Sequence, residues 1–297
     1  MNAILEFENV SRSYKRGVPV LDGVGFSVGQ GEVVGLLGRN GAGKTTLIKI
    51  AIGLLYPDSG SVRVFGLSPT AEPIAVKKRV GYVSENQELR GATIAELIAF
   101  HRYLFPMWDE ALEKSLLDRF GLARKAKIRH LSKGQARQVA LICALCHRPE
   151  LLLFDEPAGG LDPVARREFL EASIHLLNDE GTTILFSSHH MTDVERIGGR
   201  VVLLDEHRVK LDRNIDHIRE NICLAIVPLA SVADPGVLQN LPGCLRVRKA
   251  HADWHAVVEG TPEVVHQKLI SSLGHNGVRC IRVPLEELFI ELAGSER

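Results

Sequence analysis

The sequence predicts an α/β fold with a mostly parallel sheet, a helical insert and a small α+β appendix. Short apolar runs typical of buried strands alternate with helical patterns, which favours parallel strands covered by helices on both faces. The alternation is interrupted over about residues 86–148, where only helical patterns occur, and beyond about Arg213 short strand-like runs follow. We therefore expect a first domain over residues 1–213, with a helical subdomain at about 86–148, and an accessory domain over residues 214–297.

The expected elements follow in order along the chain. Strands are expected at residues 4–10, 32–37, 62–65, 80–83, 151–154, 182–186 and 200–204. Helices are expected at residues 44–53, 93–104, 109–120 and 162–177, behind Ser132, and from residue 192. Capping boxes formed by Thr93 with Glu96 and by Ser132 with Gln135 mark two of the helix starts. In the appendix we expect strands at residues 223–227, 244–248 and 255–258, and a helix at 262–273.

Composition excludes several classes of protein. The 297 residues are 45% hydrophobic, and 36 basic residues balance 36 acidic ones, so no bulk field favours a nucleic-acid partner. No stretch approaches the roughly 20 apolar residues of a membrane span, and the first residues lack the pattern of a secretion signal. Five dispersed cysteines fit reduced thiols in a cytoplasm.

The strongest motif is a complete Walker A pattern between a strand and a helix, formed by Gly38, Arg39, Asn40, Gly41, Ala42, Gly43, Lys44 and Thr45. Its glycines let successive N–H groups approach phosphate oxygens, and the start of the helix adds a positive dipole end. Lys44 is expected to reach the β- and γ-phosphates of ATP. Thr45 is expected to hold Mg²⁺, and Thr46 can add a phosphate contact.

A second set of polar residues follows the buried strand at 151–154. Asp155 and Glu156 are delivered to the carboxyl edge of the sheet, where the phosphate loop also lies. Asp155 is expected to hold Mg²⁺, and Glu156 is free to act as general base on the attacking water.

Together with these motifs, residues 131–135 (LSKGQ) resemble the LSGGQ signature of the nucleotide-binding subunit of ATP-binding-cassette (ABC) transporters. Ser132 caps a helix and Gly134 bares its first turn, so Ser132, Gly134 and Gln135 form a second anion-binding helix end. One chain already cradles its own γ-phosphate, so this end makes sense if it serves the ATP of a partner. The resemblance implies that arrangement: two subunits, identical or related, pack head to tail around two ATP molecules.

Other segments resemble the family in the same order, from about residue 4 to residue 211. Tyr14, preceding the first strand pair, matches the aromatic residue that stacks on adenine, and residues 159–162 (GGLD) match the D-loop. His189, after a serine pair, matches the switch histidine that contacts the γ-phosphate, with His190 as an adjacent rival. Residues 284–289 (PLEELF) resemble the tail of exporter-type ATPases.

The resemblance implies an Mg²⁺-dependent ATPase at the cytoplasmic face of the cell membrane that drives a separately encoded integral membrane permease, with export as the expected direction. Glu156, His189 and Lys44 would be its catalytic residues. Two alternatives are a soluble ABC-type ATPase in assembly or regulation, such as sulfur-cluster assembly, and a catalytically dead scaffold. The sequence departs from the family at Glu85, which stands where glutamine is usual and can still bind Mg²⁺ or its water, with Gln87 as a substitute. Lys133 replaces a signature glycine.

Three further patterns compete with this interpretation. Residues 143–147 (CALCH) match the haem-attachment pattern CxxCH, although the cysteines also have the spacing of one buried helix face. His251, Asp253 and His255 alternate along a strand-like run in an arrangement able to bind zinc. A basic cluster at residues 246–249 is either a solvated face or a partner surface.

Overall fold

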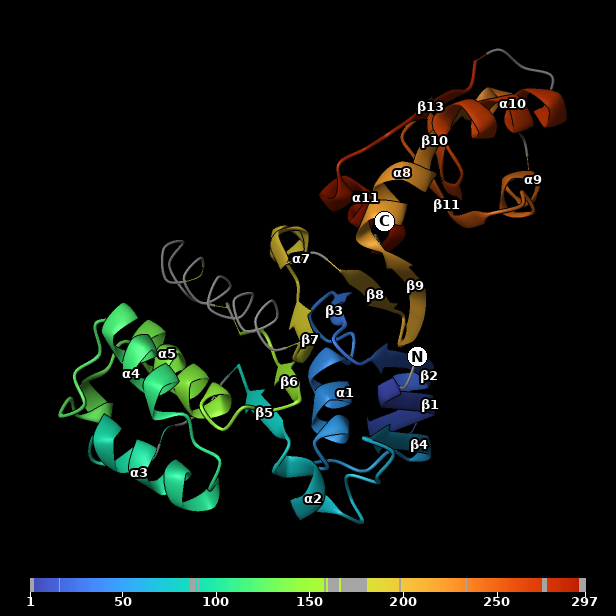
Figure 1. Cartoon of the computed structure of the whole chain (residues 1–297). Helices are drawn as coiled ribbons and strands as arrows, with labels where there is room; N and C mark the ends of the chain where they lie inside the picture. Colours follow the sequence, from blue (N-terminus) through green and yellow to red (C-terminus); the bar gives the residue numbers. More distant parts are fainter. Residues whose placement is uncertain are drawn as a thin grey trace.

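The structure is a computed structural model of the chain, and it describes residues 3–15, 17–85, 89, 91–157, 159, 166, 181–197, 199–232, 234–273 and 277–293. Three parts are visible in Figure 1: a central body of two sheets, a helical arm on one side, and the appendix on the other side. The helix expected at residues 162–177 lies outside the described residues, except for Arg166.

The central sheet carries the phosphate loop. Its strand order is β5-β6-β7-β3-β8-β9, and every neighbouring pair is parallel except β8 with β9. The bounds are β3 Val33–Gly38, β5 Val80–Val83, β6 Leu151–Phe154, β7 Thr183–Ser188, β8 Arg200–Asp205 and β9 Arg208–Asn214. Leu151 and Leu153 pack into one apolar core and Leu152 and Phe154 into another, so both faces are covered. The predicted mostly parallel sheet is confirmed.

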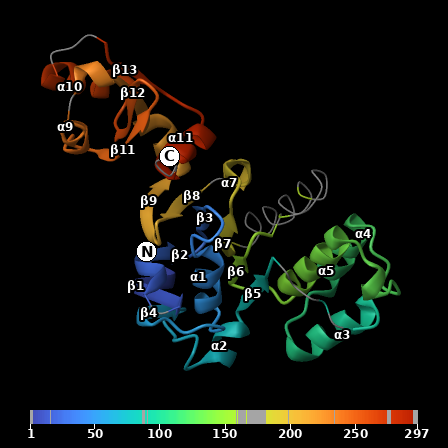
Figure 2. The same ribbon diagram turned by 180° about the vertical axis from the view of Figure 1, so that it is seen from behind.

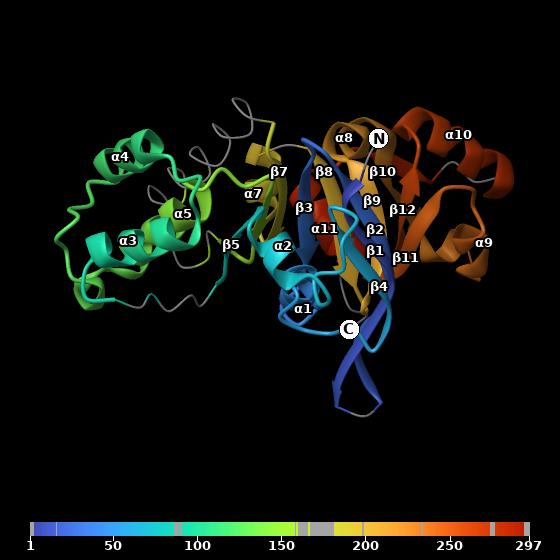
Figure 3. The ribbon, with the colours of Figure 1, turned by 60° about the horizontal axis from the view of Figure 1, so that its bottom comes forward.

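A second sheet is antiparallel, and of its three strands the sequence predicts two in part, at residues 4–10 and 62–65. Its order is β2-β1-β4, with β1 Ala3–Lys15, β2 Val18–Gly29 and β4 Ser59–Val64. Helix α1 (Lys44–Ala51) shares an apolar core with this sheet and with the central one. A short helix, α2 (Pro73–Lys77), precedes β5. Strands β1 and β2 form a long hairpin that projects from the body in Figure 3.

The arm contains three helices and stands apart from the sheets in Figure 2. They are α3 (Ile94–Leu104), α4 (Glu110–Arg119) and α5 (Lys133–Leu145), with a 3₁₀ turn at Ile128–His130. Both predicted capping boxes, at Thr93 and at Ser132, are present. The apolar face of α5 packs against α3, α4 and β5, and this packing joins the arm to the central sheet.

The appendix begins with α8 (Ile215–Asn221) and contains an antiparallel sheet of order β11-β12-β10-β13. The bounds are β10 Ile222–Pro228, β11 Cys244–Ala250, β12 Asp253–Glu259 and β13 Arg279–Ile281. A 3₁₀ turn at Leu229–Ser231 and α9 (Gly236–Gln239) connect β10 to β11, and α10 (Pro262–Leu273) connects β12 to β13. This sequence of elements is a split βαββαβ arrangement. The small α+β appendix that the sequence predicts has this topology.

The appendix returns to the central body through its last helix, α11 (Leu285–Ala293). Leu288 and Leu292 of α11 share an apolar cluster with Met191 and Val194 of α7 (Met191–Ile197). Within the appendix, buried Glu291 of α11 accepts a hydrogen bond from Arg248 of β11, which holds the helix on the sheet of the appendix. The helix that follows the histidine pair of the central sheet is therefore packed against the appendix.

Candidate functional site

The phosphate loop connects β3 to α1, as the sequence predicts. Gly43, just before Lys44, has a φ of +101°, and a Cβ there would lie 2.6 Å from a Leu21 methyl carbon and 2.7 Å from the Val20 carbonyl oxygen. Only glycine fits this position without displacing β2. The packing of the loop on the antiparallel sheet thus explains one of the motif's glycines in physical terms.

Lys44 lies buried at the centre of the site. Its Nζ donates to the Gly38 carbonyl oxygen at 2.7 Å and lies 3.1 Å from Oε1 of Glu156. The ammonium group therefore connects the loop that follows β3 to the carboxylate that follows β6. A cation at this point can attract a negatively charged group that is bound between the two segments.

Asp155 and Glu156 directly follow β6, and both are buried. Oδ1 of Asp155 accepts hydrogen bonds from the hydroxyl groups of Thr45, at 2.9 Å, and Ser187, at 3.0 Å. Burial raises the pKa of Asp155, the two hydroxyl groups oppose this, and the nearby charges of Glu156 and Glu85 raise it further. The Asp155 carboxylate and the Thr45 hydroxyl thus bring two oxygen donors together, and the charges of Glu156 and Glu85 make their surroundings electronegative, which suits a hard cation.

The Glu156 carboxylate bridges two cationic or titratable groups. Its Oε2 lies 2.8 Å from Nδ1 of His189, while Oε1 faces Lys44. Its backbone is left-handed, with a φ of 47°, which is rare for a residue with a side chain. Ser188 ends β7 directly before His189, so the strand end fixes the histidine beside the carboxylate. The His190 ring lies beside that of His189, with ring centroids 4.0 Å apart and the ring planes tilted by 41°.

Tyr14 lies beside the phosphate loop, but its position in the fold differs from the prediction. It belongs to β1 and so lies inside the hairpin, whereas the sequence placed it before the first strand pair. Its hydroxyl group is 3.2 Å from Oγ1 of Thr46, the residue is 57% exposed, and the Arg12 guanidinium lies 5.7 Å from the centroid of its ring. An exposed ring held at its edge in this way can stack on a planar group.

These residues surround one cavity of about 440 Å³, a size that suits a small-molecule ligand. Its lining residues are Tyr14, Val20, Asn40, Gly41, Ala42, Gly43, Lys44, Thr45, Thr46, Glu85, Glu156, Gly159 and His189. The structure thus brings together all the predicted groups from the phosphate loop, β6 and β7 except Gly38, Arg39 and buried Asp155, which adjoin the cavity. Of the expected D-loop, Gly159 lines the cavity, and residues 160–162 lie outside the described part of the chain, as does Gln87.

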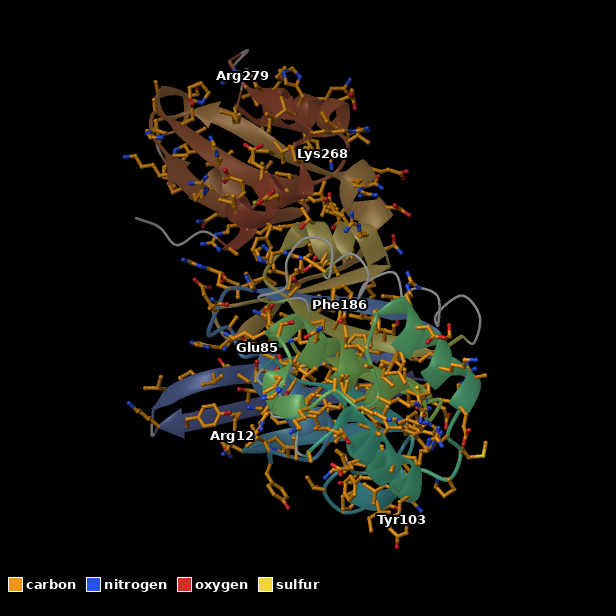
Figure 4. All side chains as sticks on the ribbon, turned by 90° about the vertical axis from the view of Figure 1, so that its left-hand side faces the viewer. Arg12, Glu85, Tyr103, Phe186, Lys268 and Arg279 are labelled. Atoms are coloured by element: carbon orange, nitrogen blue, oxygen red, sulfur yellow. The ribbon has the colours of Figure 1, made fainter. Side chains whose placement is uncertain are left out.

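Glu85 is exposed and lies where the central body meets the arm (Figure 4). It lines the cavity, and its carbonyl oxygen accepts a hydrogen bond from Arg137 of α5 at 2.5 Å. The contact to Arg137 joins the segment after β5 to the arm.

The signature segment lies elsewhere. Ser132 and Gln135 exchange the two hydrogen bonds of a capping box at the start of α5, and both side chains are exposed. Among the described residues that line the cavity, none belongs to residues 131–135. The helix end formed by Ser132, Gly134 and Gln135 therefore presents its first turn to solvent, away from the cavity of its own chain.

Sequence reasoning missed Ser187 and Arg137 as contributors to the site. Ser187 touches Asp155 and also accepts the N–H of Glu156 at 2.9 Å. Arg137 reaches the main chain on both sides of the cavity floor. Ser187 belongs to the serine pair before His189, whereas no local pattern in the sequence predicts the contacts of Arg137.

The competing patterns have structural roles in the part of the chain that the structure describes. Cys143 and Cys146 are buried in the arm, and burial raises the pKa of Cys143 to about 12. His255 contacts Glu291, and no group of three or more potential ligands is arranged to hold a metal ion among the described residues. Arg246 and Arg248 pair with Asp205 and Glu291, respectively.

Comparisons with known proteins agree with this geometry. A model of the family described as ABC transporter matches residues 21–159. The Nod factor export ATP-binding protein I of Sinorhizobium fredii (strain NBRC 101917 / NGR234) is 35% identical over 304 residues, covering 98% of this chain and 86% of that protein. A solved structure of an ATP-binding subunit of an ABC transporter is 33% identical and covers 73% of this chain and 92% of that one, with a TM-score of 0.66. The dimeric structure of a bacterial ABC transporter cassette shares the fold, at 23% identity and a TM-score of 0.63 over 71% of this chain and 98% of that one.

Proposed function

The chain belongs to the family of ABC transporter ATP-binding proteins, and on that premise we propose how its residues bind ATP, hydrolyse it and couple the hydrolysis to transport. It is an ATPase whose hydrolysis serves transport. We assign the ATPase domain to residues 1–213 with its helical subdomain at about 86–148, and an accessory domain to residues 214–297.

In this proposal one ATP binds in the 440 Å³ cavity. Tyr14 stacks on the adenine, and the N–H groups of the phosphate loop receive the phosphates at the start of α1. Lys44 turns its ammonium group to the β- and γ-phosphates, and Thr46 adds a hydroxyl contact. The central position of Lys44, within reach of both the loop and Glu156, supports this role.

Glu156 acts as the general base in the proposal. Its carboxylate is buried beside the phosphate loop, and Nδ1 of His189 lies 2.8 Å from one of its oxygens. Glu156 takes a proton from the attacking water, while His189 orients the carboxylate and approaches the γ-phosphate. Such positioned proton transfer contributes about 10²–10⁴ to the rate.

The residues present fit an Mg²⁺ ion. Thr45 and Asp155 place two oxygen donors within 2.9 Å of each other, and the carboxylates of Glu156 and Glu85 add negative charge. Mg²⁺ typically takes one or two such protein ligands together with substrate phosphates. Thr45 and Asp155 would hold the ion, with Glu85 near it or its water. When bound, Mg²⁺ neutralises charge on the phosphates.

We propose that the chain acts as a dimer with two ATP molecules at the interface. The observation that carries this step is the exposed start of α5, capped by Ser132, which does not line the cavity of its own chain among the described residues. A helix start with free N–H groups binds anions. In a head-to-tail dimer, Ser132, Gly134 and Gln135 of one copy meet the phosphates held by the other.

The partner outside the dimer is a separately encoded membrane permease, with the chain at the cytoplasmic face of the membrane. No helix in the described part of the chain is long and apolar enough to cross a bilayer. The last turns of α3 and the segment after it expose Phe100, Tyr103, Leu104 and Met107, and Figure 4 shows Tyr103 at the lower edge of the arm. Exposed apolar patches mark interaction sites, so we place the permease contact here. Export is favoured by the function of the Nod factor relative.

The proposal is tested first with Glu156→Gln. This variant should bind ATP as the wild type does and release phosphate about 10²–10⁴ times more slowly. Glu263→Gln, on α10, serves as a matched control that should retain turnover. Turnover at the wild-type rate in Glu156→Gln would contradict the assignment of the base.

The partner is tested by purification from detergent-solubilised native membranes. The wild-type chain should retain an integral membrane protein, and a variant with Tyr103→Ser and Met107→Ser should lose it while keeping its basal ATPase rate. Retention of only water-soluble partners would favour a role in assembly instead of transport.

A further inference from the structure

Arg137 connects the arm to the floor of the nucleotide cavity. Its side chain leaves α5 and reaches the central body, where Nη1 donates to the carbonyl oxygens of Glu156, at 2.9 Å, and Pro157, at 2.8 Å. Nη2 donates to the carbonyl oxygen of Glu85 at 2.5 Å. One guanidinium group therefore holds the main chain after β5 and the main chain after β6, two segments that line the cavity.

The segment that Arg137 holds is strained. Glu156 has a φ of 47°, in the left-handed region, and a non-glycine residue persists there only where its surroundings fix it. Its N–H donates to the hydroxyl oxygen of Ser187 at 2.9 Å, and its carbonyl oxygen accepts from the N–H of Gly159 at 3.0 Å in addition to Arg137. The direction of the Glu156 carboxylate thus depends on a contact from β7 and on a contact from the arm.

The chemistry of the contact requires arginine. A guanidinium group is a rigid planar fork with five N–H donors, so it can serve three carbonyl oxygens at once, whereas a lysine ammonium is a compact charge on a flexible stem. Burial lowers the pKa of Arg137, and the charges of Glu85, Glu156 and Asp155 oppose this by stabilising the cation.

We propose that Arg137 is a positioning residue, which couples the exposed tip of α5 to the backbone of Glu156 in the same chain. This inference rests on the proposed function, in which Ser132 at that tip meets the nucleotide of a second copy. Ser132 and Arg137 are five residues apart on one rigid helix, a rise of about 7–8 Å. A shift of α5 when the tip engages the partner's nucleotide is therefore transmitted to Glu156, whose base geometry is completed only in the assembled dimer.

The first test compares Arg137→Lys and Arg137→Ala with Arg119→Lys, an exposed arginine of the same arm. Both Arg137 variants should lose at least about tenfold in kcat with KM changed by less than about threefold, because the base is misplaced while ATP binding is intact. Arg119→Lys should match the wild type. An Arg137 variant whose kcat per folded molecule is unchanged, with only a lowered Tm, would show a structural role and overturn the inference.

The second test is a double-mutant cycle with Ser132→Ala, measured as kcat. If Arg137 transmits a shift of the exposed start of α5, the fold-loss of kcat caused by Ser132→Ala should be at least about threefold smaller in the Arg137→Ala background than in the wild type. Equal costs in the two backgrounds would overturn the coupling. A wild type that does not turn over ATP would refute the proposed function itself, whereas normal turnover in both Arg137 variants would refute only this inference.

Discussion

Glu113→Ala should destabilise the arm strongly, because Glu113 is a fully buried carboxylate that joins α3, α4 and the segment before α5. Its oxygens accept hydrogen bonds from Nη2 of Arg102, at 2.7 Å, and from Nε1 of Trp108, at 2.8 Å, and Arg124 pairs with it as well. Its side chain is 0% exposed. Removing the carboxylate leaves Arg124 and the indole N–H of Trp108 without this acceptor, and leaves Arg102 with only the exposed Glu110.

The expected loss of stability depends on how far Glu113 and its two arginine partners are buried. Breaking a buried ion pair typically costs about 3–5 kcal/mol. The side chains of Arg102 and Arg124 are 29% and 48% exposed and can be rehydrated, so we expect the lower end of that range, about 3 kcal/mol, for Glu113→Ala. Glu113→Gln keeps an acceptor but loses the charge, and should cost about 1–2 kcal/mol.

The assay uses the two tryptophans of the chain, Trp108 in the arm and Trp254 in the appendix. In a Trp254→Phe background, fluorescence during urea unfolding reports on the surroundings of Trp108 alone. Glu110→Gln is the control, because Glu110 contacts the same Arg102 but has a side chain that is 73% exposed. This substitution should lower the free energy of unfolding by less than about 1 kcal/mol. Glu113→Ala unfolding at the same urea concentration as Glu110→Gln would refute the reasoning.

Two further predictions concern the arm and the appendix. Burial lowers the pKa of His147 below its ordinary value of 6.5, so the unfolded chain binds the proton more readily and stability falls as the pH drops below 6.5. His147→Phe should remove that part of the loss, at most about 1.4 kcal/mol per pH unit, in urea unfolding between pH 7.5 and 5.5, and an unchanged pH dependence would contradict the assignment. Leu288→Ala, at a buried contact of α11 with α7, should lower the free energy of unfolding by about 2–5 kcal/mol, whereas Ile290→Ala, at a 56% exposed position, should change it by less than about 0.5 kcal/mol. Equal effects of the two substitutions in urea unfolding would show that α11 does not dock as observed.

Local patterns were sufficient to predict the parallel strands of the central sheet and the helices of the arm, but not the antiparallel edge strand β9. The strands at 80–83 and 151–154 and the helix at 262–273 have the predicted bounds, because each is a continuous apolar or amphipathic run between clear breakers. Both capping boxes were also predictable, since the residues involved are only three positions apart.

The elements that were missed depend on contacts between distant segments. Strand β2 contains Pro19, Asp22 and three glycines, residue types that are unfavourable in strands, and it is stabilised by pairing with β1. The position of Tyr14 was wrong for the same reason, because β1 extends to Lys15 only through that pairing. Helix α8 is short and ends where β10 begins, and its apolar residues pack into a cluster shared with the central body.

In the candidate site, the motifs indicate which residues gather but do not give their mutual contacts. The sequence places Lys44, Asp155, Glu156 and His189 at one sheet edge, because parallel strands end there together. That the Glu156 carboxylate lies between Lys44 and His189 could not be read from spacing, since it depends on side-chain directions and on the left-handed backbone of Glu156. The reach of Arg137 is equally non-local: it contacts residues 19 and 52 positions away.

The most direct test of the central claim is the molar mass of the chain with ATP, measured by light scattering during size-exclusion chromatography. Glu156→Gln loaded with Mg²⁺ and ATP should elute at twice the mass of the chain. Adding Ser132→Arg should leave ATP binding to each copy intact and return the mass to that of one chain, because the bulky side chain blocks the exposed tip of α5. A Glu156→Gln sample that is saturated with ATP and still has the mass of a single chain would contradict the account.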